Sequence, residues 1–126
     1  DLHERWVGAL QGTPNRPETG LWPDTLARWT AGDTHHAPDT SESWDQVQSR
    51  ALRALDRLAR TGYPGPLAVV AHGLLLKVAL LTITGEGPAG WPTFGPIRNT
   101  EIFTVDHSAT GWRLIAKPPP VTGGGP

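Results

Sequence analysis

The sequence contains no cysteine, and this absence excludes disulfide bonds, thiol catalysis and thiolate metal sites together. It also lacks a charge bias, because 11 Lys and Arg against 12 Asp and Glu leave a formal net charge of −1. A chain of this kind has no broad basic surface for nucleic acid or anionic lipid, so neither is expected as a partner. Any anion site must therefore be local.

Long apolar runs are missing as well. The longest, Leu74–Ile83, carries Lys77 and falls short of the roughly 18 residues that a membrane helix needs. No basic segment followed by an apolar one opens the chain, so no signal peptide is predicted. Together with the absence of cysteine, this favours a cytoplasmic location. The first residue is Asp1 rather than Met, as expected of a chain that has been cut, processed or read from a partial frame.

The 126 residues suit one small domain. The tail Pro118–Pro126 (PPPVTGGGP) cannot bury apolar area, so we expect residues 1–117 to form the domain and the tail to be disordered or a linker. Residues 13–42 are rich in Pro, Gly, Thr and Asp. They predict a long loop with one short helix around Pro23–Ala31.

The clearest helical pattern covers residues 43–60. Ser43 can cap the N-terminus, and Gln46 three residues later completes a capping-box pattern. The apolar residues recur at three-four spacing, which predicts one buried stripe: Trp44, Val47, Ala51, Ala54, Leu55 and Leu58. The arginines at positions 50, 53, 57 and 60 are expected on other faces, and Gly62 ends the helix.

An α/β arrangement is predicted for the second half of the chain. Leu67–Ala71 (LAVVA) is a short apolar run bounded by turn residues, typical of a buried strand, and a buried helix is expected over Leu74–Ile83. A helix, a buried strand and a helix indicate a parallel strand covered on both faces. Thr100–Asp106 and Trp112–Ala116 predict an antiparallel hairpin at one edge.

His72 is the strongest candidate for chemistry, because it stands where the predicted strand gives way to Gly73 and a helix. Ligands bind at the carboxyl ends of strands in open α/β sheets, and a helix N-terminus offers free N–H groups to a phosphate. A histidine there can donate to a phosphoryl oxygen or act as a base. A buried histidine with a backbone partner would give the same pattern, so both interpretations stay open.

Other polar residues carry weaker signals on their own. Glu4 is a possible general acid and Arg5 a possible phosphate ligand, although an exposed Glu-Arg pair is the ordinary interpretation. Glu42 is expected to be a carboxylate favourably placed before a helix. The pair His35-His36 has too few neighbouring ligands for zinc, and no metal site is predicted.

Taken together, several segments resemble the histidine phosphatase superfamily, and especially phosphoglycerate mutases. The likeness runs in order over residues 2–116: Leu2–Gly12 (LHERWVGALQG), Asn15–Thr19 (NRPET), Ser41–Arg50 (SESWDQVQSR), Leu67–Lys77 (LAVVAHGLLLK), Asn99–Asp106 (NTEIFTVD) and Gly111–Leu114 (GWRL). The resemblance implies a three-layer α/β fold, a phosphoglycerate-mutase-like sheet with flanking helices.

In that family a histidine of an R-H-G motif attacks phosphorus, arginines and a second histidine hold the phosphoryl oxygens, and a carboxyl group protonates the leaving oxygen. By resemblance His72 is the second histidine and Glu4 the proton donor. The resemblance also implies that Arg5, Gly73 and Asn99 contact substrate or phosphate. Such a route needs no metal or organic cofactor, and the implied partner is a small phosphorylated substrate.

The most serious departure from the family is that no R-H-G occurs in the sequence. The resemblance then implies that the N-terminal strand is missing, that buried sheet edges are unpaired, and that these residues alone are inactive. We favour part of a phosphomonoester hydrolase. The alternatives are a phosphomutase, a non-catalytic phosphate-binding module, and a structural domain in which His72 is only a core residue. Arg16 and NRPET favour the mutase, whereas Val7 replaces the Tyr of mutases. The sequence leaves the substrate and the oligomeric state open.

Overall fold

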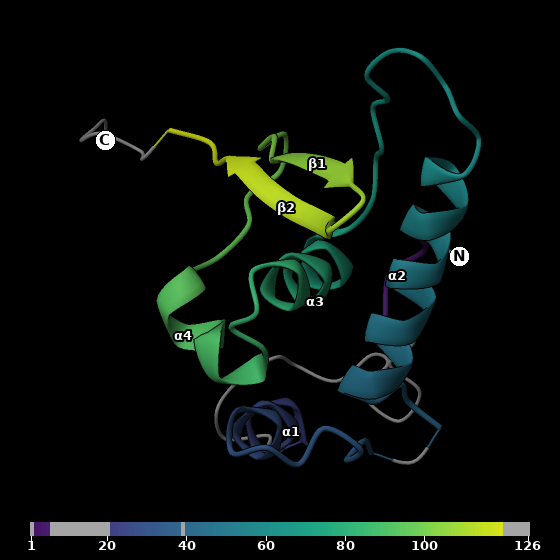
Figure 1. Ribbon diagram of the computed structural model, residues 1–126. Coiled ribbons are helices and arrows are strands. Elements are labelled where there is room, and N and C mark those ends of the chain that lie inside the picture. Colours follow the sequence, from purple (N-terminus) through teal and green to yellow (C-terminus); the bar gives the residue numbers. More distant parts are fainter. Residues whose placement is uncertain (1, 6–20, 39, 120–126) are drawn as a thin grey trace.

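The computed structural model describes residues 2–5, 21–38 and 40–119. Its elements, in chain order, are α1 (Leu21–Thr30), α2 (Trp44–Ala59), α3 (Gly73–Ile83), a 3₁₀ turn η3 (Pro88–Gly90), α4 (Trp91–Phe94), β1 (Thr104–Ser108) and β2 (Gly111–Ala116). Helix α3 lies at the centre, with α2 along one side, the β1–β2 hairpin over it, and α1 and α4 on the remaining sides (Figure 1). The fold is mixed α/β, as predicted.

Helix α2 begins as the sequence predicts. The Ser43 hydroxyl accepts from the backbone N–H of Gln46, and the Gln46 side chain accepts from the backbone N–H of Ser43. This reciprocal pair satisfies two donors that the first turn leaves free. Its apolar stripe packs on α3, where Val47 and Ala51 meet Leu75 and Val78 in the core.

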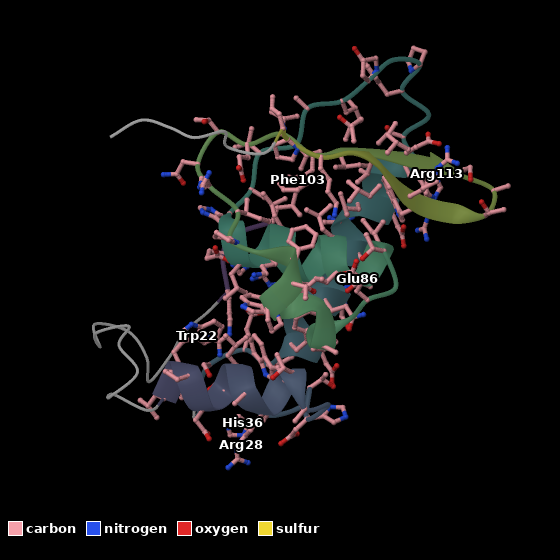
Figure 2. All side chains as sticks on the ribbon, turned by 90° about the vertical axis from the view of Figure 1, so that its left-hand side faces the viewer. Trp22, Arg28, His36, Glu86, Phe103 and Arg113 are labelled. Atoms are coloured by element: carbon pink, nitrogen blue, oxygen red, sulfur yellow. The ribbon has the colours of Figure 1, made fainter. Side chains whose placement is uncertain are left out.

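Four tryptophans form a ring under the core. Trp22, Trp29, Trp44 and Trp91 contact one another edge to face around a closed circuit, with centroid separations of 5.5 to 6.2 Å. Such contacts add to the apolar area that each ring buries. The ring joins α1, α2 and α4, and Figure 2 shows Trp22 on the inner side of α1, with Arg28 and His36 on the outer side. Trp29 and Trp44 belong to the buried core, and Trp22 and Trp91 pack against it.

The hairpin is confirmed with shifted strand ends. Its strands are antiparallel, with Ser108 opposite Gly111 and a two-residue turn between them. The first strand starts at Thr104 rather than at the predicted Thr100, because the preceding residues form a turn. In this turn the Glu101 carboxylate accepts from the Arg98 N–H, and Thr100 has a φ of 68°.

The predicted buried strand Leu67–Ala71 is wrong for the described residues. This segment is not a strand there, and the sheet contains only β1 and β2. Its apolar side chains face solvent, with Val70 at 91% exposure and Leu67 at 49%. A short apolar run becomes a buried strand only when neighbouring strands and helices cover it, and the described part of the chain supplies no such neighbour.

Among the described helices, none is both long enough and apolar enough to cross a bilayer. Residues 1, 6–20, 39 and 120–126 lie outside the described part of the chain. Arg16 and most of the tail that is predicted to be disordered are among them.

Two valines of opposite exposure test this arrangement. Val78 is fully buried in α3 and Val70 is almost fully exposed. Because burial sets the cost of losing two methyl groups, Val78→Ala is expected to lower the free energy of unfolding by about 2 kcal/mol. Val70→Ala should change it by less than about 0.5 kcal/mol. Urea denaturation measures both. An equal loss in the two variants would show that the Leu67–Ala71 segment is buried in solution.

Candidate functional site

The candidate site lies at the N-terminus of α3, where His72 is the N-cap residue. Its backbone is extended, with φ −111° and ψ 155°, and its carbonyl accepts the first helical hydrogen bond from Leu76 N–H at 2.9 Å. The imidazole makes no capping hydrogen bond, and the residue is exposed. His72 is therefore not a buried core residue, and its ring is available to a ligand at this helix end.

The Glu4 carboxylate occupies the same helix end. Its two oxygens accept from the N–H groups of Leu74 and Leu75, at 3.1 and 3.0 Å, and Oε1 also accepts from Arg5 N–H at 2.8 Å. The first turn of a helix leaves its N–H groups without intrahelical partners and carries the positive end of the helix dipole. A carboxylate satisfies both, so the chain's own anion sits where the sequence predicts an anion site.

Gly73 and Asn99 were both predicted to contact substrate or phosphate, but only Gly73 belongs to this end of α3. Gly73 is the first residue of α3, and a Cβ placed on it would lie 3.7 Å from the carbonyl oxygen of Ile97. Asn99 follows two residues later in the connection from α4 to β1 and is exposed. The structure thus brings Glu4, His72 and Gly73 together, and among the described residues no hydrogen bond joins Asn99 to them.

Arg5, predicted as a substrate ligand, is buried, with 4% of its surface exposed. Its guanidinium lies over the rings of Trp22 and Trp29, at 5.3 and 5.0 Å, and its Nε donates to the carbonyl of Glu42 at 2.8 Å. Burial lowers the pKa of Arg5, while the charges of Glu42 and Glu4 raise it. In this position the Arg5 side chain serves packing, and its N–H holds the Glu4 carboxylate.

Arg50 is the residue that sequence reasoning missed. Its predicted position is outside the buried stripe of α2, but only 9% of its surface is exposed. Its Nε and Nη2 bind the two carboxylate oxygens of Glu42 at 2.8 and 2.9 Å. Nη1 donates to the carbonyl of His3 at 2.6 Å and Nη2 to that of Glu4 at 2.9 Å.

The spacing of residues in α2 did indicate that Arg50 is buried. Arg50 stands three residues after Val47 and four before Ala54, so helical spacing places it on the buried stripe. The expected role of Glu42, a carboxylate near the start of a helix, is only part of its function. It is chiefly the bidentate partner of Arg50.

The remaining histidines of this region belong to local structure. His35 pairs with Asp45, and the carbonyl of His36 accepts from the Trp29 indole at 2.8 Å. Within the described ranges, no three His, Cys, Asp or Glu side chains gather closely enough to hold a metal ion.

The Arg50 contacts predict a specific loss on conservative substitution. Arg50→Lys keeps the charge but cannot reproduce the planar fork that binds Glu42 and two carbonyls. We expect the free energy of unfolding to fall by on the order of 2 kcal/mol. Arg53→Lys, an exposed matched control on the same helix, should change it by less than about 0.5 kcal/mol. Equal values from urea denaturation would mean that the Arg50 fork contributes nothing.

Comparison with known proteins places the chain in a family. The model of the histidine phosphatase superfamily (branch 1) matches residues 1–117. A metal-independent phosphoserine phosphatase of Arabidopsis thaliana is 32% identical over 91 residues, which are 71% of this chain and 38% of that protein.

A solved structure, mycobacterial hydrolase 1, superimposes with a TM-score of 0.73 at 24% identity, over 94% of this chain and 61% of the other. That likeness shows a shared fold. The chain spans 38% of the length of the first relative and 61% of the second. With the family model covering all but the last nine positions, the chain belongs to the histidine phosphatase superfamily, branch 1.

Proposed function

We propose that this chain carries the second histidine and the proton donor of a phosphomonoester hydrolase that works through a phosphohistidine intermediate. One observation carries the proposal: Glu4 and His72, about seventy residues apart in sequence, meet at the N-terminus of α3. The dipole of this helix end favours an anion, and the Leu74 and Leu75 N–H groups hold the Glu4 carboxylate there. Family membership supports a phosphoryl group as that anion.

In the proposed reaction His72 donates a hydrogen bond to a phosphoryl oxygen, and its accessible ring leaves room for the group to approach. Glu4 protonates the leaving oxygen as the bond to phosphorus breaks. Gly73 lets the phosphoryl group approach the backbone, and Asn99 contributes from the adjoining loop. Arg5 acts mainly by holding Glu4. Positioning and electrostatic stabilisation of this kind account for most of the catalysis in phosphoryl transfer.

The attacking histidine is not among these residues, since no R-H-G occurs in the sequence. The covalent step, which would split one difficult displacement into two easier ones, needs a nucleophile from other sequence. We therefore propose that the 126 residues alone bind phosphate without turning over a phosphomonoester. The Arabidopsis relative is named for phosphoserine, which makes a small phosphomonoester of that kind the first substrate to assay.

A larger sheet is part of the same proposal. Leu67–Ala71 leads directly into His72, has no strand partner among the described residues, and exposes apolar side chains. Those properties suit a strand of a three-layer sheet whose neighbouring strand comes from other sequence. With that neighbour in place, His72 would stand at the carboxyl end of a parallel strand, the usual position of a ligand site in such folds.

Phosphate binding tests the site without depending on turnover. Inorganic phosphate should raise the melting temperature of the chain, and His72→Ala should weaken its apparent affinity about tenfold, the loss of one hydrogen bond to a charged group. His35→Ala removes a histidine whose side chain is 91% exposed and should leave the affinity unchanged. An equal effect of phosphate on all three proteins would contradict a phosphate site at His72.

Hydrolysis of an aryl phosphate gives the second test. The 126-residue chain should show no turnover above background. Turnover that His72→Ala abolishes would contradict the assignment, because His72 would then be the nucleophile. Phosphate binding without turnover even after an R-H-G-bearing segment is supplied would favour the non-catalytic phosphate-binding module.

A further inference from the structure

A hollow of about 460 Å³ opens between α3 and α4. Its walls come from the first half of α3, from Trp91 and Pro92 of α4, and from the Gly95–Ile97 segment that follows. This volume suits a small organic ligand. The hollow is mostly apolar, and Lys77 is the one charged residue in its lining.

Lys77 is an unusual residue for this position. Only 7% of its surface is exposed, and its Nζ lies over the Trp91 ring at 4.1 Å from the centroid. Across the described residues, no carboxylate or carbonyl binds this ammonium, and the Trp91 ring is its sole partner. Burial lowers the pKa of Lys77. A cation–π contact offsets part of the loss of hydration but does not neutralise the charge.

The residues of the lining indicate which chemical class of ligand the hollow can bind. Leu74, Pro92, Pro96 and Ile97 offer apolar contact and no second cation. A carboxylate brings one negative charge, which a single ammonium balances. A phosphate dianion would bring two charges to a lining that has one cation and otherwise apolar walls. The lining therefore fits a monovalent anion attached to an apolar body.

We propose that this hollow binds a small carboxylate on an apolar or aromatic body, with the carboxylate on Lys77 Nζ and the body against Trp91 and the two prolines. The site borders Gly73 but concerns binding alone. It stands whether or not the chain takes part in phosphomonoester hydrolysis, and its test uses no phosphatase assay.

The test measures binding of 2-naphthoate to the 126-residue chain by isothermal titration, with 2-naphthylmethanol as the neutral counterpart. Naphthoate should bind more tightly than the alcohol. Lys77→Met should weaken naphthoate binding about tenfold or more, equivalent to about 1.4 kcal/mol, and leave the alcohol unchanged. Lys77→Arg should retain most of the affinity. Lys117→Met removes the same charge from an exposed residue and should have no effect.

A second variant keeps the test decisive if Lys77→Met fails to fold. Pro96→Asp lies outside α3 and places a carboxylate in the lining, so it should weaken naphthoate binding by repulsion and spare the alcohol. Near-ultraviolet circular dichroism checks that the four tryptophans remain packed in each variant. The proposal is overturned if naphthoate does not bind, if Lys77→Met and Lys117→Met bind it equally, or if the alcohol binds as tightly. Tighter binding of 2-naphthyl phosphate than of naphthoate would also overturn the choice of a carboxylate.

Discussion

The guanidinium of Arg50 fixes the geometry on which the candidate site depends. It binds both oxygens of Glu42 and the carbonyls of His3 and Glu4, so one side chain of α2 joins two distant parts of the chain. The segment 2–5 is neither helix nor strand, so the regular backbone hydrogen bonds of those elements do not hold it in place. Arg50 supplies that support and thereby lets the Glu4 carboxylate reach the N-terminus of α3.

The cost of burying charge explains why this cluster is so fully bonded. A buried ion pair stabilises a fold only when hydrogen bonds satisfy the remaining donors and acceptors. Arg50 meets this condition with a bidentate pair and two carbonyls. Arg5 meets it with a carbonyl and the faces of two tryptophans. Lys77 has only Trp91 among the described residues, and this contrast distinguishes a structural cation from one that can accept a ligand.

Local patterns in the sequence predicted the elements that local physics determines. The capping box of Ser43 and Gln46, the stripe of α2, the apolar helix α3 and the hairpin all follow from spacing and turn chemistry between near neighbours in the chain. The strand at Leu67–Ala71 failed because burial of a strand depends on neighbours that its own residues do not specify. The spacing of Arg50 from Val47 and Ala54 indicated burial, but its carbonyl partners lie 46 and 47 residues away and could not be predicted from neighbouring residues.

The sequence likewise predicted those parts of the site that depend on neighbouring residues and missed those that depend on distant ones. His72 followed from its place between a short apolar run and a helix, which is local information. Glu4 gained weight only through a family resemblance, because nothing near residue 4 indicates that it contacts residues 74 and 75. The Lys77 hollow could not be predicted, since α3 and α4 form it only after they pack together.

Arg50 is thus assigned the role of holding Glu4 against the N-terminus of α3. Amide hydrogen exchange, followed by NMR, tests this role most directly in the Arg50→Lys variant. We predict faster exchange at the amides of Leu74 and Leu75, which donate to Glu4. Exchange at Leu76, which donates to the His72 carbonyl within the helix, should change much less. Unchanged exchange at Leu74 and Leu75, or an equal increase at all three amides, would contradict this role of Arg50.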